Sequence, residues 1–327
     1  MWMSTDSKTQ LEPIVSAKEP KITLNHPRLK AIQRRAAWAA TLIPALGSVL
    51  AFVIALQTGI GLVEIGLLVM MYSLTAIGIS VGYHRYFCHC TFQTNTTVRV
   101  ILAILGSMAL MGTVTSWVAD HRRHHKYTDA YGDPHSPHCH DDQRLTGLRG
   151  LWHAHVSWMF NSDITNFALF AKDLLQDSTL VKVNRLYWTW VMLGLGIPAV
   201  LGGILTASWM GALQGFLWGG LVRIFLINNI LAWGNNSIGH YYGSRPFKVN
   251  DQSRNNFWLA VQNFGEGWHN NHHAFPNSAI MGLEWWQIDM GGWVIRVLEK
   301  LGLAWEVKVP SAAAREAKRN EVEKAEG

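Results

Sequence analysis

The sequence predicts an all-α integral membrane protein in which four transmembrane helices carry a cytoplasmic helical cap. Hydropathy is the first reason, because four stretches approach the roughly 20 apolar residues that cross a hydrocarbon core. They are residues 36–56, 62–81, 187–208 and 210–233. The second reason is that eight of the fifteen histidines stand in three clusters beside these stretches, HRYFCH, HRRHH and HNNHH. Imidazole is a common metal ligand, so this pattern favours a metal centre at the membrane surface.

The predicted order along the chain is a polar tail (residues 1–27), a membrane domain (28–300) and a charged tail (301–327). The domain's predicted cytoplasmic parts are residues 84–186 and 236–300. A fifth apolar run, residues 98–116, contains two glycines and is expected to lie at the membrane interface or inside the protein. The end of the charged C-terminal tail, residues 312–327, is expected to be frayed helix or disordered.

Basic residues predict the orientation of the spans. Arg28, Lys30, Arg34 and Arg35 precede the first span, whereas the turn at residues 57–61 carries no charge. By the positive-inside rule, both termini, both polar parts and every histidine cluster are cytoplasmic. The net charge of +6 fits contact with anionic lipid headgroups, and the sequence shows no nucleic-acid signature.

The histidine spacing predicts metal ligands. HxxHH places three imidazoles within about 100° of helical arc, so we expect all three to converge on one side. The clusters comprise His84, His89, His121, His124, His125, His269, His272 and His273. His240, in NNSIGHYYG at the end of the fourth span, is the predicted ninth ligand, because a polar side chain near a membrane is costly unless it has a role. Asn236 lies one helical turn earlier on the same face.

Nine imidazoles exceed what one metal ion needs, whereas two ions with four or five nitrogen ligands each would use them all. No carboxylate occupies a ligand-like position within the clusters, unlike the Glu-x-x-His pattern of soluble di-iron bundles. A hydrolytic zinc site rarely needs more than three histidines and a water. Two redox metals beside a membrane therefore indicate activation of dioxygen and attack on an unactivated C–H bond.

Four stretches resemble the membrane fatty acid desaturases, specifically the acyl-CoA Δ9 (stearoyl-CoA) group in its bacterial-type form without a fused cytochrome b5 domain. They are GYHRYFCHCTF, WVADHRRHHKYTDAYGDPH, WGNNSIGHYYGSRPF and NFGEGWHNNHHAFP, and the resemblance runs from about Val81 to Pro276. It implies two iron ions held by the nine histidines, with Asn236 reaching one iron through a water. It also implies four transmembrane helices under a cytoplasmic cap, and no catalytic residue beyond the metal ligands is expected.

The resemblance implies an oxidoreductase that uses O2 and external electrons to introduce a cis double bond, expected at Δ9, into a saturated acyl thioester. Trp117 and Trp233 match positions that line the family's acyl tunnel. Tyr72 lies twelve residues before His84, or about 18 Å along a helix, and is expected to close the tunnel and favour shorter chains.

The acyl carrier stays open between CoA and acyl carrier protein, because Ala119 stands where the animal acyl-CoA enzymes have an arginine. Arg122, Arg123 and Lys126 are expected either to bind a phosphate-bearing carrier or an acidic electron donor, or to be solvated charges. Electrons are expected from a separate ferredoxin, rubredoxin or cytochrome b5-like donor with its reductase.

Three alternatives stay open at this point. The first is an acetylenase, or a desaturase acting on acyl carrier protein or phospholipid substrates. The second is a membrane di-iron hydroxylase, which the NNSIGH stretch disfavours. The third is a transporter with a histidine-rich sensor, disfavoured because transporters place polar ligands near the midplane and these spans contain almost none.

Overall fold

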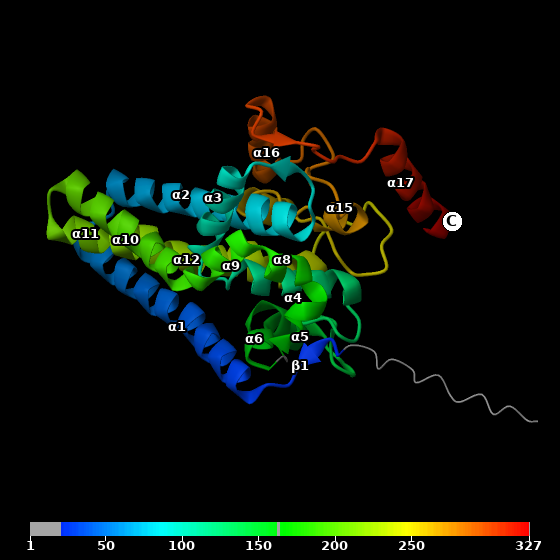
Figure 1. Cartoon of the computed structure of the whole chain (residues 1–327), viewed down its shortest axis with the longest axis horizontal. Helices are drawn as coiled ribbons and strands as arrows, with labels where there is room; N and C mark the ends of the chain where they lie inside the picture. The colour runs from blue at the N-terminus through cyan, green and yellow to red at the C-terminus, as the bar shows by residue number, and fades with distance from the viewer. Residues whose placement is uncertain (1–20, 162–163, 327) are drawn as a thin grey trace, which may run out of the picture.

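The computed structural model describes residues 21–161 and 164–326 and is built almost entirely of helices (Figure 1). Within these residues, four helices are long and apolar enough to cross a membrane: Pro27–Thr58, Leu62–Cys88, Tyr187–Thr206 and Trp209–His240. Each overlaps one predicted span, so the predicted number and order of spans are confirmed. The predicted polar tail lies mostly outside the described residues, and only residues 21–27 of it can be followed.

Two of the spans are continuous α-helices and two contain wider, π-helical turns. The first is α1 (Pro27–Thr58) and the third is α10 (Tyr187–Thr206). The second joins α2 (Leu62–Ile77) to the π-helical η1 (Gly78–Cys88). The fourth runs through α11 (Trp209–Gly215), η3 (Phe216–Val222), α12 (Arg223–Leu226), η4 (Ile227–Trp233), α13 (Gly234–Ser237) and η5 (Ile238–His240). The second and fourth spans continue past their apolar stretches, as Leu62–Cys88 and Trp209–His240, and carry His84 and His240 in these extensions.

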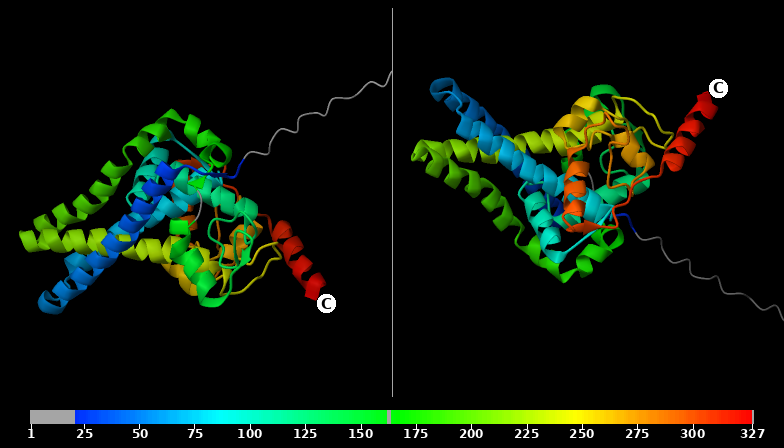
Figure 2. Two further views of the ribbon diagram at one scale, coloured as in Figure 1. Left: turned by 90° about the horizontal axis from the view of Figure 1, so that it is seen from below. Right: turned by 90° about the horizontal axis from the view of Figure 1, so that it is seen from above.

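The spans extend to one side of the molecule and the remaining elements form a cap at the other (Figures 1 and 2). Close packing between spans depends on small residues. At Gly215 of α11, a Cβ atom would lie 2.1 Å from the Pro198 carbonyl oxygen of α10, so glycine is required for this helical hairpin to close. At Gly78, a Cβ atom would lie 2.1 Å from the Gly106 nitrogen, which brings the cap against η1.

The cap is helical, as predicted, and is assembled from three regions of the chain. Its first region contains α3 (Thr96–Ser107) and α4 (Val114–Tyr127), so the apolar run 98–116 is divided between two helices and does not span. Its middle region contains α5 (Gly147–Trp152), η2 (His153–Ser157), α6 (Trp158–Asn161), α7 (Phe167–Phe170), α8 (Lys172–Gln176) and α9 (Ser178–Arg185). Its last region contains α14 (Phe257–Gln262), α15 (His269–Ala274) and α16 (Met290–Lys300).

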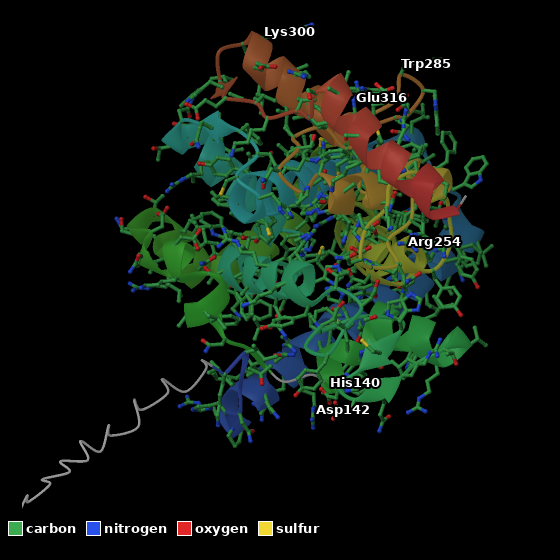
Figure 3. The ribbon with its side chains drawn as sticks, turned by 90° about the vertical axis from the view of Figure 1, so that its right-hand side faces the viewer. His140, Asp142, Arg254, Trp285, Lys300 and Glu316 are labelled. Carbon is green, nitrogen blue, oxygen red and sulfur yellow. The ribbon has the colours of Figure 1, made fainter. Side chains whose placement is uncertain are left out.

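Three short antiparallel strand pairs join segments of the cap to one another. β1 (Thr23–Leu24) pairs with β5 (Ile164–Thr165), and β2 (Gln93–Thr94) pairs with β6 (Ala304–Trp305). β3 (Cys139–His140) and β4 (Gln143–Arg144) form a hairpin between α4 and α5. In Figure 3, this hairpin lies at the edge of the cap opposite Lys300, as its labelled residues His140 and Asp142 show.

The C-terminal tail is more firmly attached than the sequence suggests. Besides β6, it contains a helix, α17 (Ala312–Glu326), which extends from the cap in Figure 1. Lys318 of α17 donates to the Ala274 carbonyl at 2.6 Å, and Arg315 donates to the Leu283 carbonyl at 2.5 Å. These two bonds attach the first turns of α17 to the third cap region.

Candidate metal centre

The nine predicted ligand histidines come together in two adjoining groups beneath the cap. Five of them, His84, His89, His121, His125 and His272, form what we call the five-histidine site. The other four, His124, His240, His269 and His273, form the four-histidine site. Within each group, each histidine offers one ring nitrogen, and these nitrogens all lie within 4.8 Å of one another. The expected division into one set of five and one of four is therefore what the fold produces.

The ligands reach the centre from four helical segments of the chain. His84 lies in η1 and His240 at the end of the fourth span, so both spans deliver a ligand just past their apolar parts. The second cluster lies on α4, which begins where the Thr113 hydroxyl accepts a hydrogen bond from the Ser116 amide at 3.2 Å. The third cluster occupies α15, which ends before the Phe275–Pro276 break.

Each HxxHH cluster brings all three of its histidines to the centre and divides them between the two sites. On α4, His121 and His125 enter the five-histidine site, whereas His124 enters the four-histidine site. On α15 the assignment is reversed, because His272 alone joins the five-histidine site and the other two join the four-histidine site. Residues i and i+4 are about 40° apart around a helix, whereas i+3 lies about 60° from i in the opposite sense. On each helix, the histidines at i and i+4 therefore belong to one site and the histidine at i+3 belongs to the other.

The separations between ring nitrogens fit metal ligation. In the five-histidine site, His272 Nε2 lies 3.1 Å from His84 Nε2 and 2.8 Å from His125 Nε2. In the four-histidine site, His269 Nε2 lies 2.9 Å from His240 Nε2 and 3.1 Å from His273 Nε2. Two nitrogens bound at right angles about 2.1 Å from one metal ion are about 3.0 Å apart. The nitrogen separations in each site therefore fit ligands that share one metal ion.

Carboxylates behind the rings set which nitrogen faces the centre. The Nδ1 atoms of His124, His240 and His273 lie 2.9–3.0 Å from carboxylate oxygens of Asp133, Asp129 and Asp251, respectively. The Nδ1 atom of His84 meets Glu266 in the same way. An ionised carboxylate accepts a hydrogen bond from Nδ1–H, so each Nε2 lone pair is left for a metal. Sequence reasoning missed these four acids, although Asp129 and Asp133 directly follow the second cluster and Glu266 closely precedes the third.

The charges of the centre also suit metal ligation, because neutral imidazoles face the centre and ionised acids lie behind several of them. Burial lowers the pKa of six ligand rings well below the ordinary value, and neighbouring imidazoles lower it further: His89, His121, His125, His269, His272 and His273. Burial raises the pKa of Asp133, but His124 and His135 more than offset this, so its pKa lies below the usual range. The pKa of Glu266 is likewise lowered by His84 and Arg85 against the effect of burial.

An apolar cavity of about 420 Å³ reaches the centre from the side of α1 and α10. His84 and His121 of one site and His124 and His269 of the other form part of its wall. The predicted tunnel residues Trp117 and Trp233 both line it, as does Asn236. Trp117 also stacks on His121, with ring centroids 4.9 Å apart. The cavity can therefore bring an apolar chain to both sites at once.

Comparisons with known proteins agree with this geometry. The family model for fatty acid desaturases matches residues 61–305. The chain belongs to the fatty acid desaturase family. It is 48% identical to a hex-5-enoyl-[acyl-carrier protein] acetylenase of Moorena producens (strain JHB), over 96% of this chain and 97% of that relative. It is 36% identical to Delta-9 acyl-lipid desaturase 1 of Arabidopsis thaliana, over 75% of each chain. It is 32% identical to the sn-1 stearoyl-lipid 9-desaturase of Anabaena variabilis, over 81% of this chain and 90% of that relative.

This membership makes the protein an oxidoreductase of fatty acyl chains, embedded in a membrane through its four apolar helices. The nine-histidine arrangement is therefore the candidate metal centre of this desaturase. The transporter alternative is thereby excluded, because the chain matches a family of enzymes over three of its four spans and the whole centre.

Tyr72 does not lie where the sequence suggested in this desaturase. Its side chain packs beside Phe264, at 6.4 Å between ring centroids, and its hydroxyl donates to the Gln262 carbonyl at 2.8 Å. It is not part of the wall of the cavity that reaches the metal centre. The structure therefore shows Tyr72 joining α2 to α14, because its hydroxyl is satisfied by the last residue of α14.

The basic residues of the second cluster divide into two buried or paired arginines and one exposed lysine. Arg123 is 5% exposed and donates to the Gly132 carbonyl at 2.7 Å, so the expected contact with a carrier at the surface does not fit its position. Arg122 forms a bidentate ion pair with Asp173 and donates to the Phe87 carbonyl at 2.9 Å. Lys126 is exposed beside the Tyr127 ring and is the member of the three that a partner could reach.

Two further histidines lie near the centre without joining it. His155 bonds Ser237 at 3.0 Å through Nδ1 and Asn229 at 3.2 Å through Nε2, so its ring contacts no ligand histidine through these bonds. His135 lies behind the four-histidine site, with its ring centroid 4.5 Å from that of His124. Asp133 accepts a hydrogen bond from the backbone amide of His135 at 3.0 Å and also meets the His124 ring, so it connects His135 to this ligand histidine.

Proposed function

We propose that this desaturase binds two iron ions, one in each histidine site, and uses O2 to introduce a cis double bond into an acyl chain. The observation that carries the proposal is that a five-nitrogen site and a four-nitrogen site adjoin each other in the wall of one apolar cavity. All-imidazole sites suit several transition metals. Zinc has no redox chemistry, whereas an oxidative family reaction requires a redox metal, and this favours iron.

The proposed reaction balances as a four-electron reduction of dioxygen. Two hydrogen atoms leave adjacent methylene groups, and O2 takes them up with two external electrons and two protons, which gives an alkene and two water molecules. Iron, when bound, supplies O2 activation and the oxidising power to break the C–H bonds.

The chain's own residues orient and enclose these reactants. Asp129, Asp133, Asp251 and Glu266 hold the ligand rings with Nε2 toward the centre. Trp117 stacks on a ligand ring and faces the cavity, so it keeps an acyl chain beside the centre and limits access of water. We propose that Asn236, at the same wall, contacts one ion through a water.

We further propose that the acyl chain arrives as a thioester of acyl carrier protein. This is supported by the carrier named for the Moorena relative and by Ala119, which is buried and offers no charge for CoA. Δ9 is proposed as the position of the double bond, as the names of the Arabidopsis and Anabaena relatives suggest. The second candidate product is a triple bond, which the 48% identity with an acetylenase favours.

The electrons are proposed to come from a separate ferredoxin, rubredoxin or cytochrome b5-like donor and its reductase. Both termini and the metal centre are proposed to lie on the cytoplasmic side. Arg28, Lys30, Arg34 and Arg35, in the first turns of α1 beside the cap, support this orientation.

Expression in a host that lacks unsaturated fatty acids, followed by mass spectrometry that locates new unsaturation, tests the proposal. An alkene supports desaturation, an alkyne supports the acetylenase, and a hydroxylated product without unsaturation contradicts both. Acyl carrier protein, CoA and phospholipid substrates should then be compared with purified enzyme and a competent donor. Turnover confined to CoA or phospholipid would contradict the proposed carrier while leaving the chemistry intact.

A further inference from the structure

The carboxylates behind the ligand rings are unevenly divided between the two sites. Three of the four rings in the four-histidine site carry one: His240 meets Asp129 at 2.9 Å, His124 meets Asp133 at 3.0 Å, and His273 meets Asp251 at 2.9 Å. The fourth ring, His269, meets the side-chain amide of Asn235 at 3.0 Å. In the five-histidine site, within the part of the chain that the structure describes, the carboxylate partner is Glu266 on His84.

The charge of Glu266 is also opposed by a cation. Arg85, fully buried, lies 3.3 Å from Glu266 Oε1 through Nη2 and forms two bonds to Asp289, at 2.8 and 3.1 Å. The Ser80 hydroxyl donates to the same Glu266 oxygen at 2.5 Å. Glu266 therefore belongs to a buried network in which part of its negative charge is compensated.

The three aspartates of the four-histidine site are held mainly by neutral donors. Asp129 accepts from the Ser136 hydroxyl at 2.6 Å and the Gln252 amide at 2.8 Å. Asp133 accepts from the backbone amides of Asp129 and His135, at 2.8 and 3.0 Å. Asp251 accepts from the Ser253 amide at 2.8 Å, while Arg245 binds its backbone carbonyl. Their side chains are only 0–12% exposed, so solvent screens these charges weakly.

A carboxylate on Nδ1 makes an imidazole a stronger electron donor, and its negative charge favours the higher oxidation state of a nearby metal ion. The fifth imidazole of the five-histidine site also favours the higher oxidation state, but it is a neutral donor and adds no net charge. Three weakly compensated carboxylates outweigh that neutral ligand. On the proposed iron pair, on which this step rests, we infer that the four-histidine site stabilises Fe3+ more strongly and has the lower reduction potential. An external one-electron donor then reduces the iron of the five-histidine site first.

Reductive titration of the full-length enzyme loaded with 57Fe, followed by Mössbauer spectroscopy, tests this inference. We expect two resolved one-electron steps, with one ferrous and one ferric ion at the midpoint. Asp251→Asn removes a charge from the four-histidine site, so it should raise the lower potential and narrow the gap between the steps. Glu266→Gln removes the charge on His84, so it should raise the higher potential and widen the gap.

General disruption of the fold would not give these opposite changes. Asp129→Asn should reproduce the narrowing through His240 if Asp251→Asn does not accumulate. Asp177→Asn is the matched control, because Asp177 pairs with Arg99 at 2.8 Å and touches no ligand ring, so neither potential should move. A single unresolved step, or a shift of the higher potential in Asp251→Asn, would overturn the inference. Iron analysis separates the two levels: fewer than two irons in the active enzyme contradicts the proposed pair itself, whereas two irons with equal potentials contradict only their inequality.

Discussion

The rings of His125 and His273 stack with their centroids 4.6 Å apart and their planes 23° apart, although they belong to different sites. His125 comes from α4 and His273 from α15, so this contact joins the two ligand helices directly. The sites consequently share a wall of imidazole rings, and a ligand lost from one changes the packing of the other. This relationship makes the two-site arrangement a single packed unit.

Removal of one ligand should empty one site. We expect His240→Ala to lower the iron content from about two ions per chain to about one, because three imidazoles remain at the four-histidine site. Turnover should fall by more than about 100-fold, since even changes behind the ligands cost 10–100-fold in metal affinity or activity. Iron analysis and a turnover assay measure both effects. His155→Ala is the control, and this variant should keep both irons, because the ring nitrogens of His155 bond Ser237 and Asn229. Undiminished iron content in His240→Ala would refute the assignment of His240 as a ligand.

A bulky side chain in the cavity should reduce turnover without removing iron. Ala40 of α1 lines the cavity, so Ala40→Phe places a ring in the space proposed for the acyl chain. We expect kcat/KM to fall at least about tenfold, which corresponds to about 1.4 kcal/mol. Leu42→Phe is the matched control on the same helix, because Leu42 is 48% exposed on the apolar surface of the span. Equal activity in the two variants would mean that the acyl chain does not occupy this cavity.

Acid should destabilise the metal-free protein steeply. Six ligand histidines have pKa values held well below 6.5 by burial, whereas in the unfolded chain they titrate near that value. Below pH 6.5 the unfolded state therefore binds more protons, and the free energy of unfolding falls by up to about 1.4 kcal/mol per pH unit for each histidine. The contribution is fully present above this range. Thermal unfolding of the apo protein between pH 8 and 5 measures it, and a flat profile would contradict neutral, buried rings.

The two basic residues Arg122 and Lys126 should behave differently when replaced by alanine. Arg122 bonds the Phe87 and Cys88 carbonyls just before His89, so Arg122→Ala should lower the melting temperature and the iron content. The unsatisfied carbonyls cost about 1–3 kcal/mol. Lys126→Ala should leave both quantities unchanged, because its ammonium group is exposed. The KM for the acyl substrate distinguishes a structural role of Arg122 from a contact with the acyl carrier. A raised KM in Arg122→Ala with a normal melting temperature would show that Arg122 binds substrate instead.

Local patterns in the sequence determined the spans and the identity of the nine histidines. Hydropathy is a local property, so the four spans could be located to within a few residues at most ends. The HxxHH spacing places its histidines along one face of a helix, and His240 stands out because it follows an apolar span in a polar sequence. These features depend on neighbouring residues, which is why they can be recognised without a structure.

Only the tertiary structure decided how the histidines divide and which acids hold them. Helical spacing separates His124 from His121 by about 60°, but the site that each ring enters depends on where η1 and the fourth span end. Glu266 contacts His84 across 182 residues of sequence, and Asp129 contacts His240 across 111. No local pattern specifies such pairs, because they form only when the hairpins of spans bring their ends together. The same long-range packing placed Tyr72 against α14 and buried Arg123, which the chain order alone could not reveal.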